Sequence, residues 1–529
     1  MKKKILVINI AILLICHLTY SQSIFHIAYG TSESETIGNT EIDTDNGLIS
    51  AGQKMYPSQN LNYFYGYLLN SNTNGDLIWA KNFSINGYSG YFSHAIKSFD
   101  KGFVAIGIQI DSIAGPSDIL MVKTDNFGNV LWSKKYGSAG NESGTKIIET
   151  SDYGYLALGG TYGAGGIGSC DIYIIRTDSI GNLLWSRIYG GIDPDKGMDI
   201  IQTNDGGFLV VGYTYSFGVN NFDIYVLKIE SNGNILWSKT YEEDGWETGA
   251  VGIQTNDGGY LIAGKTFDGS SPFKTILIKT TELGDTIWSK TYSIPGFTSL
   301  TVNSLIQTSD SNYVLVGFVE NAPGYYDAYL FKVDNNGNCL WANSFSSTQW
   351  FYSVWETTDN GLIMSGNDNG YFGMGGNDAL VVKTNSNGYS GCYQQTEIPL
   401  TEISHPMASN VITQMDSGGV GSNILVTAND DNNIQTNICY YTTNHFELSE
   451  NKSELQIFPN PTTGLLIIKN EELIIKNVAV YDIYGKEIHI NRSLSLSKCE
   501  IDISQQPQGI YIIKVITDNQ TITRKLIKQ

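Results

Sequence analysis

Hydrophobic and polar residues alternate in short runs along most of the chain, and Gly, Asn and Asp residues bound these runs. Three consecutive runs show the pattern: GFLVVG at 207–212, DIYVLK at 223–228 and ILWSKTY at 235–241. Alternation with a period of two, together with many β-branched and aromatic residues, predicts β-strands joined by turns. The chain is therefore predicted to be all-β.

A tryptophan marks the period of these runs. Each unit contains a Trp strand, a strand ending in QT, a strand like GFLVVG and a strand of the form DxYxxK. Seven units are present, and Phe25 takes the Trp place in the first. Units of four strands and about 52 residues predict a seven-bladed β-propeller over residues 22–391. The recurring tryptophans, 51 to 53 residues apart, are Trp79, Trp132, Trp185, Trp237, Trp288 and Trp341.

Residues found in every unit are predicted to hold the blades together. The turn T-x-D-x-G, as in TNDGG at 203–207, places an Asp where it accepts backbone N–H bonds, and its Gly is expected to take a positive φ. A Lys or Arg ends the DxYxxK strand and is expected to form an ion pair within its blade. The turn aspartates are Asp45, Asp100, Asp152, Asp205, Asp257, Asp310 and Asp359, and the bases are Lys123, Arg176, Lys228, Lys279, Lys332 and Lys383.

The connections between strands alternate between tight and long. Alternate connections of an up-and-down blade lie at the same end, so all the long ones are predicted to share one face. Ligands usually bind to long loops on a rigid scaffold. Residues on that face that break the repeat are therefore the candidates for recognition.

Four carboxylates on this face break the repeat, because three units lack them. They could hold Ca²⁺ or polarise a glycan, or they could pair with a neighbouring Lys or with loop N–H groups. Aromatic side chains in or beside the long loops could stack on sugars or anchor a protein partner, or they could pack between blades. The acids are Glu35, Glu142, Asp195 and Glu247, and the leading aromatic candidates are Trp246, Trp350, Tyr352, Tyr371 and Phe372.

The distribution of charge along the chain limits the classes of partner that the protein can bind. Residues 22–447 carry 19 basic and 43 acidic side chains, whereas residues 448–529 carry 10 and 9. A strongly negative propeller repels phosphate backbones and anionic lipid, which argues against nucleic acid and membrane surfaces. Cations, neutral glycans and basic partners remain compatible.

The N-terminus has the pattern of a secretory signal peptide over residues 1–21. Three lysines precede an apolar run, Ile5–Ile15, that is too short to span a bilayer, and Ser21 ends a plausible cleavage site. A lipoprotein signal at Cys16 is the weaker alternative. No later apolar stretch approaches the roughly 20 residues that a transmembrane helix needs.

Residues 392–447 are rich in Ser, Thr, Asn and Gly and are predicted to be a linker or a small β element. Cys392 and Cys439 flank this segment and are the best candidates for a disulfide, which export would permit.

The C-terminal residues contain four blocks: ELQIFPNPTTGLLII from 454, VAVYDIYGKEI from 478, IDISQQPQGIYIIKV from 501 and a final TRKLIKQ. In this order they resemble the type A C-terminal sorting domain of the type IX secretion system of Bacteroidetes. The resemblance implies a small Ig-like β-sandwich over residues 448–529, recognition by the outer-membrane translocon and a sortase, and a secreted or surface location. The matching residues are Pro459, Asn460, Pro461, Gly464, Tyr481, Asp482, Gly485, Gly509, Tyr511 and Lys525.

Two hypotheses about function follow. The first is a non-enzymatic binding or adhesion protein for glycan or protein ligands, with no cofactor except the Ca²⁺ considered above. The alternative is a secreted enzyme that acts on polysaccharide, of the glycoside hydrolase or lyase type, with carboxylates on the long-loop face. The sequence contains no Ser–His–Asp or HExxH arrangement, so no catalytic residue is predicted.

Overall fold

The computed structural model describes residues 23–442 and 456–528, apart from short gaps that lie mostly in connections. Every regular element in the described residues is a strand. None of the described residues forms a helix long and apolar enough to cross a membrane. The chain divides into two compact units, Met1–Asn444 and His445–Gln529, which are described separately.

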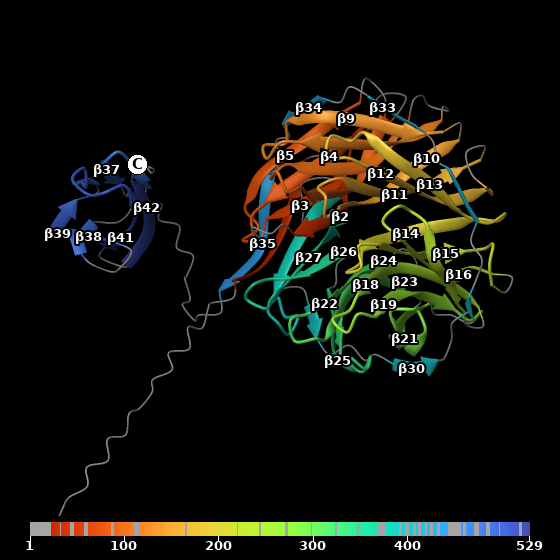
Figure 1. Ribbon diagram of the computed structural model, residues 1–529. Coiled ribbons are helices and arrows are strands. Elements are labelled where there is room, and N and C mark those ends of the chain that lie inside the picture. Colours follow the sequence, from red (N-terminus) through yellow and green to blue (C-terminus); the bar gives the residue numbers. More distant parts are fainter. Residues whose placement is uncertain are drawn as a thin grey trace, which may run out of the picture. The chain divides into compact units, whose positions relative to one another are not determined.

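The first unit is a ring of seven antiparallel sheets around a central channel, which confirms the predicted propeller (Figure 1). We number the blades I to VII in chain order.

Blades I to III take their strands from the first third of the chain. Blade I contains β2 (Ser34–Ile42), β3 (Leu48–Pro57), β4 (Asn62–Ser71) and β5 (Leu77–Ser84); blade II contains β6 (Ser89–Lys97), β7 (Phe103–Ile110), β8 (Ser117–Thr124) and β9 (Val130–Gly137); blade III contains β10 (Asn141–Glu149), β11 (Tyr155–Tyr162), β12 (Cys170–Thr177) and β13 (Leu183–Gly190).

Blades IV to VI repeat this order. Blade IV contains β14 (Asp195–Gln202), β15 (Phe208–Thr214), β16 (Asp223–Ile229) and β17 (Ile235–Tyr241); blade V contains β18 (Trp246–Gln254), β19 (Tyr260–Phe267), β20 (Lys274–Thr280) and β21 (Thr286–Ser293); blade VI contains β22 (Ser299–Gln307), β23 (Tyr313–Ala322), β24 (Tyr325–Val333) and β25 (Cys339–Phe345).

Blade VII joins the two ends of the ring. It contains β26 (Gln349–Glu356), β27 (Leu362–Asp368), β28 (Asp378–Thr384) and, as its fourth strand, β1 (Ser23–Gly30) from the start of the chain. Phe25 pairs with Lys383 and Tyr29 with Ala379. The blades are therefore offset by one strand from the sequence repeat. The Trp strand, which is the first strand of each sequence unit, forms the fourth strand of a blade whose other three strands belong to the preceding unit.

A fifth strand covers the outer edge of every blade, and residues 394–442 supply all seven of these strands. The segment runs around the ring against the order of the blades, from blade VI through blade I and on to blade VII. It thus covers edges that would otherwise expose unpaired backbone groups. Its strands are β29 (Gln394–Thr396), β30 (Thr401–His405), β31 (Ser409–Asn410), β32 (Gln414–Ser417), β33 (Val420–Asn423), β34 (Thr427–Asp430) and β35 (Ile434–Thr442).

This belt, residues 394–442, occupies most of the segment for which the sequence left a linker or a small β element open. It forms no sheet of its own in the described residues, because each strand pairs with the fourth strand of a blade. Its last strand, β35, pairs with β1 from Ser23 to Gly30. The N-terminal strand is therefore held on both sides, by β28 and by β35. The proposed Cys392–Cys439 disulfide lies outside what the structure describes, since Cys392 falls in a gap.

The recurring tryptophans lie at the seams between blades. Each is partly buried against the hydrophobic core and reaches the glycine of a D-x-x-G-N-type turn in the next blade. At Gly233, which has φ +88°, an added Cβ would lie 3.1 Å from both the Trp185 ring and the Tyr189 hydroxyl. The same approach occurs at Gly128, Gly181, Gly284, Gly337 and Gly388.

At five of the seven seams a tyrosine on the same strand completes this contact, and its hydroxyl donates to the carbonyl of that glycine. The distances are 2.6 Å from Tyr189 to Gly233 and 2.7 Å from Tyr241 to Gly284. Phe83 and Phe345 take the place of the tyrosine at the other two seams. The closing seam is built in the same way, since Phe25 packs beside Gly75 and Tyr29 donates to the Gly75 carbonyl. Repetition of the unit therefore serves the joining of blades.

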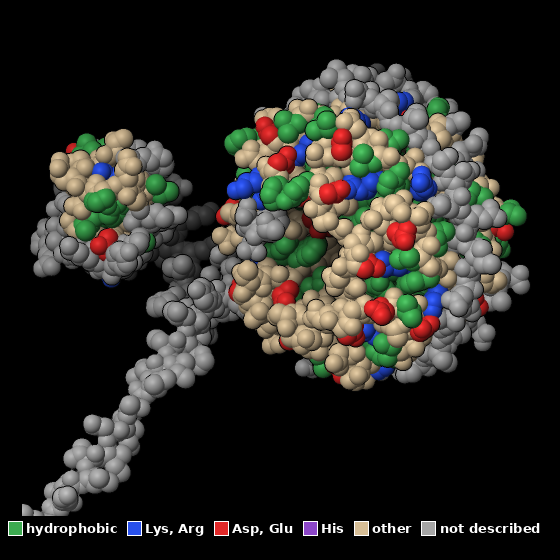
Figure 2. Space-filling view, viewed as in Figure 1, with side chains coloured by type: hydrophobic (Ala, Val, Ile, Leu, Met, Phe, Trp, Pro, Cys, Tyr) green, Lys and Arg blue, Asp and Glu red, His purple; other side chains and the backbone are tan. Residues whose placement is uncertain are grey.

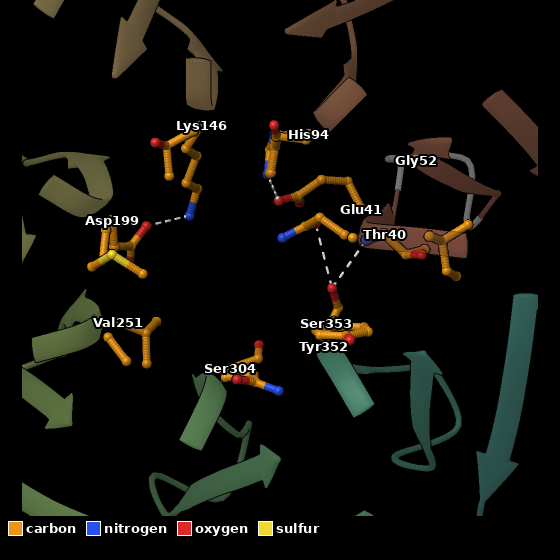
Figure 3. A pocket seen from close by; sticks show the side chains of 18 of the residues that line it. Thr40, Glu41, Gly52, His94, Lys146, Asp199, Val251, Ser304, Tyr352 and Ser353 are labelled. Atoms are coloured by element: carbon orange, nitrogen blue, oxygen red, sulfur yellow. Dashed lines mark hydrogen bonds and ion pairs between the residues drawn. The ribbon is translucent and has the colours of Figure 1, made fainter. Parts of the chain in front are cut away.

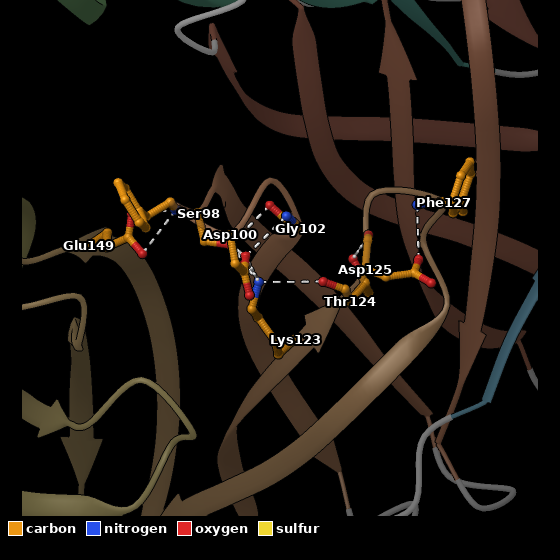
Figure 4. Close-up of polar contacts among 9 residues, drawn as sticks. Ser98, Asp100, Gly102, Lys123, Thr124, Asp125, Phe127 and Glu149 are labelled. Atoms are coloured by element: carbon orange, nitrogen blue, oxygen red, sulfur yellow. Dashed lines mark hydrogen bonds and ion pairs between the residues drawn. The ribbon is translucent and has the colours of Figure 1, made fainter.

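The T-x-D-x-G turns carry the expected hydrogen bonds and ion pairs, as Figure 4 shows for Asp100 and Lys123. In the turn at Asp205, the carboxylate accepts from Thr203 at 2.5 Å and from Gly207 N at 3.0 Å, and it lies 2.8 Å from Lys228. Equivalent pairs join Arg176 to Asp152, Lys279 to Asp257, Lys332 to Asp310 and Lys383 to Asp359. Asp45 lies outside the described residues.

One detail of these turns differs from expectation. The fourth residue of the turn, and not the fifth, takes the positive φ: Gly206 and Gly258 do so in two turns, and Lys101, Tyr153, Ser311 and Asn360 do so in four others. The final Gly is required by space, because a Cβ at Gly102 would lie 2.1 Å from the Thr124 carbonyl oxygen.

The second unit is a two-sheet β-sandwich, as predicted. One sheet contains β36 (Gln456–Phe458), β37 (Leu465–Lys469) and β40 (Lys498–Asp502), and the other has the order β39 (Glu487–Leu496), β38 (Ile475–Asp482), β41 (Gly509–Thr517) and β42 (Thr521–Lys528). Both sheets contribute to one core, which includes Ile468, Val480, Ile501, Ile513 and Leu526.

Substitution of Gly233 by Ala tests the seam. Gly206→Ala is the matched control, since Gly206 has a similar φ of +81° but nothing within 4 Å of an added Cβ. We expect backbone strain alone to lower the free energy of unfolding of the control by about 1–2 kcal/mol. Gly233→Ala should lose roughly 1–3 kcal/mol more, because the methyl group meets Trp185 and Tyr189. Equal losses in urea unfolding would contradict the seam role.

The turn carboxylates predict a loss of stability in acid. Burial acts to raise the pKa of Asp205, but hydrogen bonds from Lys228, Thr203 and Gly207 outweigh it and lower the pKa to about 2. The folded pKa lies below the unfolded value of about 3.9. The stabilisation by the ionised Asp205 carboxylate is therefore complete above about pH 4 and disappears as pH falls towards 2.

Asp205→Asn measures this contribution. The Asp205 side chain is 56% exposed, so we expect the variant to lose less than about 1 kcal/mol of its free energy of unfolding at pH 6. The difference between the variant and the native protein in urea unfolding should shrink from pH 4 to pH 2. A difference that stays constant over this range would show that the ion pair does not supply it.

Candidate functional site: the central channel and the long-loop face

A cavity of about 900 Å³ lies at the centre of the ring. The first strand of each of the seven blades lines it, so these strands are the innermost ones. Figure 2 shows the hollow in the face of the ring, with hydrophobic side chains inside it. Figure 3 shows the polar side chains that point into it.

A β-bulge recurs at the same place in every innermost strand. In blade I it falls between Ile37 and Asn39, and in blade IV between Gly197 and Asp199. Bulges re-aim side chains and are frequent beside functional sites. Here the residue after the bulge differs between most blades, in contrast to the repeated seams. These post-bulge residues, taken around the ring, are Asn39, His94, Lys146, Asp199, Val251, Ser304 and Ser353.

One half of this ring is charged, and its groups bridge adjacent blades. The Lys146 ammonium lies 2.5 Å from Asp199, which also accepts from Gly252 N at 2.9 Å. The His94 Nε2 lies 3.0 Å from a Glu41 carboxylate oxygen. These contacts join blade III to IV, IV to V and I to II.

The pKa of Lys146 reflects this crowding of charge. Burial acts to lower it, but the carboxylates of Asp199 and Glu41 outweigh burial and raise it above its ordinary value. Lys146 is therefore a fixed cation at neutral pH and is not a candidate base.

The other half of the ring is neutral. Ser353 accepts from Thr40 N at 3.0 Å, Ser304 accepts from Val354 N at 3.3 Å, and Val251 presents an apolar surface. The channel is thus asymmetric in charge, as recognition of an asymmetric ligand requires.

Among the predicted ligand residues that the structure describes, Tyr352 alone lines the channel. Burial raises the pKa of Tyr352 and of Tyr91, which lines the same cavity together with Phe64. The channel walls therefore combine aromatic rings with the polar groups of the post-bulge ring.

Trp246 lies on the long-loop face and is 52% exposed. It belongs to a strip of rings across blades IV and V, in which Phe222 lies 6.2 Å and Phe267 6.5 Å from its centroid in edge-to-face contact. Phe267 stacks on Phe273 at 4.6 Å. Tyr215, 44% exposed, extends the strip beyond Phe222 at 5.1 Å.

The remaining predicted aromatics are placed differently. Trp350 is partly buried and packs against Tyr326, with ring centroids 5.6 Å apart. Tyr371 and Phe372 lie outside the described residues.

The four predicted carboxylates are fully buried near the starts of innermost strands. Glu35 lies 2.9 Å from Lys54 and accepts from Thr31 N at 3.0 Å. Asp195 accepts from Gly191 N at 2.6 Å and from Ser216 at 2.8 Å, and burial raises its pKa.

Glu142 and Glu247 follow the same plan, since each accepts from a threonine of the next strand, Thr161 at 3.0 Å and Thr266 at 2.9 Å. Each carboxylate thus bonds to its own blade or to the connection that leads into it. In the part of the chain that the structure describes, no group of three or more His, Cys, Asp or Glu residues is arranged to hold a metal ion.

The sequence did not point to the post-bulge ring, because none of its members is unusual by itself. Alignment of the repeats on the acidic position would have revealed it. The relevant signal is that the residue four positions after the acid differs in type between most of the units.

The described sorting residues support the fold of the second unit. A Cβ at Gly464, which has φ +138°, would lie 2.4 Å from Ser504 Cα. Tyr511 is buried and donates to the Pro507 carbonyl at 2.6 Å. Tyr481 and Asp482 end β38, Gly509 begins β41 and Lys525 pairs with Ile512, whereas Pro459, Asn460, Pro461 and Gly485 lie outside the described residues.

Comparison with solved structures gives distant likenesses. A protein of unknown function from Bacteroides caccae is 12% identical over 60% of this chain and 93% of its own, with a TM-score of 0.34. PorZ of Porphyromonas gingivalis, a surface component of the type IX secretion system, is 10% identical over 92% of this chain and 69% of its own, with a TM-score of 0.37. A puromycin hydrolase is 9% identical over 64% and 51%, with a TM-score of 0.41. Scores at this level carry no argument about function.

At the level of sequence, no curated protein matches the chain. The family of secretion system C-terminal sorting domains matches residues 456–529. This match covers the β-sandwich and does not extend into the propeller. Residues 456–529 therefore form a C-terminal sorting domain, and the chain is a seven-bladed propeller exported by the type IX secretion system to the cell surface or beyond.

Proposed function

We propose that the exported propeller is a non-enzymatic binding protein for glycans, acting in adhesion or nutrient capture. The observation that carries this proposal is the aromatic strip around Trp246 on the long-loop face. Exposed indole and phenol rings offer flat apolar surfaces on which sugar rings stack. The edge-to-face contacts hold the rings in place, so little side-chain entropy is lost on binding.

The surroundings of the strip favour a neutral polar ligand over an anionic one. The propeller carries a large excess of acid, which repels sulfated or phosphorylated partners. Polar groups stand beside the rings, including Ser216, Lys265 and the Lys274–Asp268 ion pair. Hydrogen bonds from such groups would fix the orientation of a stacked sugar.

The alternative is an enzyme that acts on polysaccharide, and one observation favours it. Two carboxylates, Glu41 and Asp199, reach the central channel. Each already has a basic neighbour, His94 or Lys146. A hydrolase would have to release one of them to donate a proton, so binding without cleavage is the simpler account.

Trp246→Ala tests the proposal on the mature protein with an array of glycans and polysaccharides. We expect the variant to lose at least tenfold in affinity for the ligands that the native protein binds, equivalent to about 1.4 kcal/mol. Phe99→Ala is the matched control, because Phe99 is 71% exposed in a tight turn on the opposite face. Equal loss in both variants, or no loss in either, would contradict the assignment.

Each hit on the array is also incubated and assayed for shorter products, with and without Ca²⁺. Products would favour the enzyme alternative. A requirement for Ca²⁺ would support the hypothesis that the ion is held by Glu35, Glu142, Asp195 and Glu247. A blank array would point to a protein partner.

Deletion of residues 454–529 tests the export route. Without the sorting domain the translocon and the sortase have no substrate, so we expect the propeller to accumulate in the periplasm. Fractionation followed by immunoblotting measures this, and a cargo that keeps its own sorting domain serves as the control. Release of the truncated chain into the medium as efficiently as the native chain would overturn the prediction.

A further inference from the structure

The channel contains one charged residue at a level that is otherwise apolar. Two residues after the bulge, six blades place Ile or Trp, and blade I places Glu41. Ile201, Ile253, Ile306 and Trp355 line the cavity at this level. An acid that replaces an isoleucine inside a ring serves no purpose in packing, since the other six blades are built without it.

The charges around Glu41 do not balance within the channel. Among the described residues that line it, the charged groups are two carboxylates, one ammonium and one histidine. Lys146 contacts Asp199, which also accepts from Gly252 N. Asp199 is therefore satisfied by the protein, and the negative charge that remains is on Glu41.

His94 contacts Glu41 and is itself almost completely buried, at 1% exposed. Its Nδ1 is buried and has no hydrogen-bond partner. The tautomer that fits donates from Nε2 to Glu41 and leaves an unprotonated Nδ1, because a buried N–H without an acceptor is costly. In this tautomer His94 orients the carboxylate without neutralising it.

The carboxylate of Glu41 is still accessible to a ligand. Its side chain is 18% exposed, and this exposure is to the channel that it lines. Figure 3 shows Glu41 directed inward and next to His94. The tyrosines Tyr91 and Tyr352 belong to the same cavity.

We propose that the central channel is a binding site for a small organic cation, with a protonated amine on Glu41 and an apolar or aromatic body against Ile253, Ile306 and Trp355. A cavity of about 900 Å³ is within the range that holds a ligand of this kind. The acidic propeller would raise the local concentration of such a cation. This site is separate from the aromatic strip and does not depend on the glycan proposal.

The test uses 4-fluorobenzylamine as the probe and 4-fluorobenzyl alcohol as its neutral counterpart. Binding to the mature full-length protein is measured by ¹⁹F NMR line broadening in a titration. We expect the amine to bind at least tenfold more tightly than the alcohol. Equal affinities, or no binding of the amine, would overturn the proposal.

Glu41→Gln removes the charge and keeps the shape and the acceptor for His94. We expect it to weaken amine binding at least tenfold and to leave alcohol binding unchanged. The matched control is Glu282→Gln, on an exposed turn, which should change neither. Unchanged amine binding in Glu41→Gln would overturn the assignment of the residue.

Lys146→Met should change the affinity for the amine in the direction opposite to Glu41→Gln. Loss of the ammonium frees Asp199, so the amine should bind several-fold more tightly provided that the thermal midpoint shows a folded variant. Weaker binding in a folded variant would contradict the charge argument. Trp246→Ala should leave amine binding intact, which separates this site from the glycan site.

Discussion

The structure depends on one contact that recurs at the seams between blades. An aromatic side chain of the fourth strand, Trp in six blades and Phe25 in the last, packs on a turn glycine of the following blade. The glycine has a positive φ and no side chain, so the ring can approach the backbone. Because each contact crosses a seam, it fixes the angle between adjacent sheets as well as their separation. The width of the central channel follows from those angles.

The closing seam joins the two ends of the propeller. β1 comes from the start of the chain, β28 and β35 come from the end, and all three are neighbours in one sheet. The belt that ends in β35 pairs first, in chain order, with the outer edges of the other six blades. Because the belt pairs these edges, they offer no template for pairing with another chain.

The sequence predicted the repeated parts of the molecule well. The Trp period identified seven blades, and the T-x-D-x-G turns and strand-end bases predicted ion pairs that the structure contains at six turns. The belt was harder to predict because its strands are short, down to two residues at Ser409–Asn410, and their pairing partners lie far away in sequence. Glu35, Glu142, Asp195 and Glu247 stood out by breaking the repeat, and the structure buries all four and gives each a hydrogen bond near the start of its strand. The post-bulge ring escaped notice because its residues are chemically ordinary one at a time.

Two kinds of position therefore divide the work of the propeller. Repeated residues join the blades, and residues that differ between blades, such as Glu41 and Trp246, face the channel or the long loops. A closed ring requires the closing seam to be as firm as the other six. Hydrogen exchange read by mass spectrometry tests this directly by comparing β1 amides from Phe25 to Tyr29 with those of β9 around Trp132. We predict equal protection in the mature protein, whereas rapid exchange of β1 beside a protected β9 would contradict a closed ring.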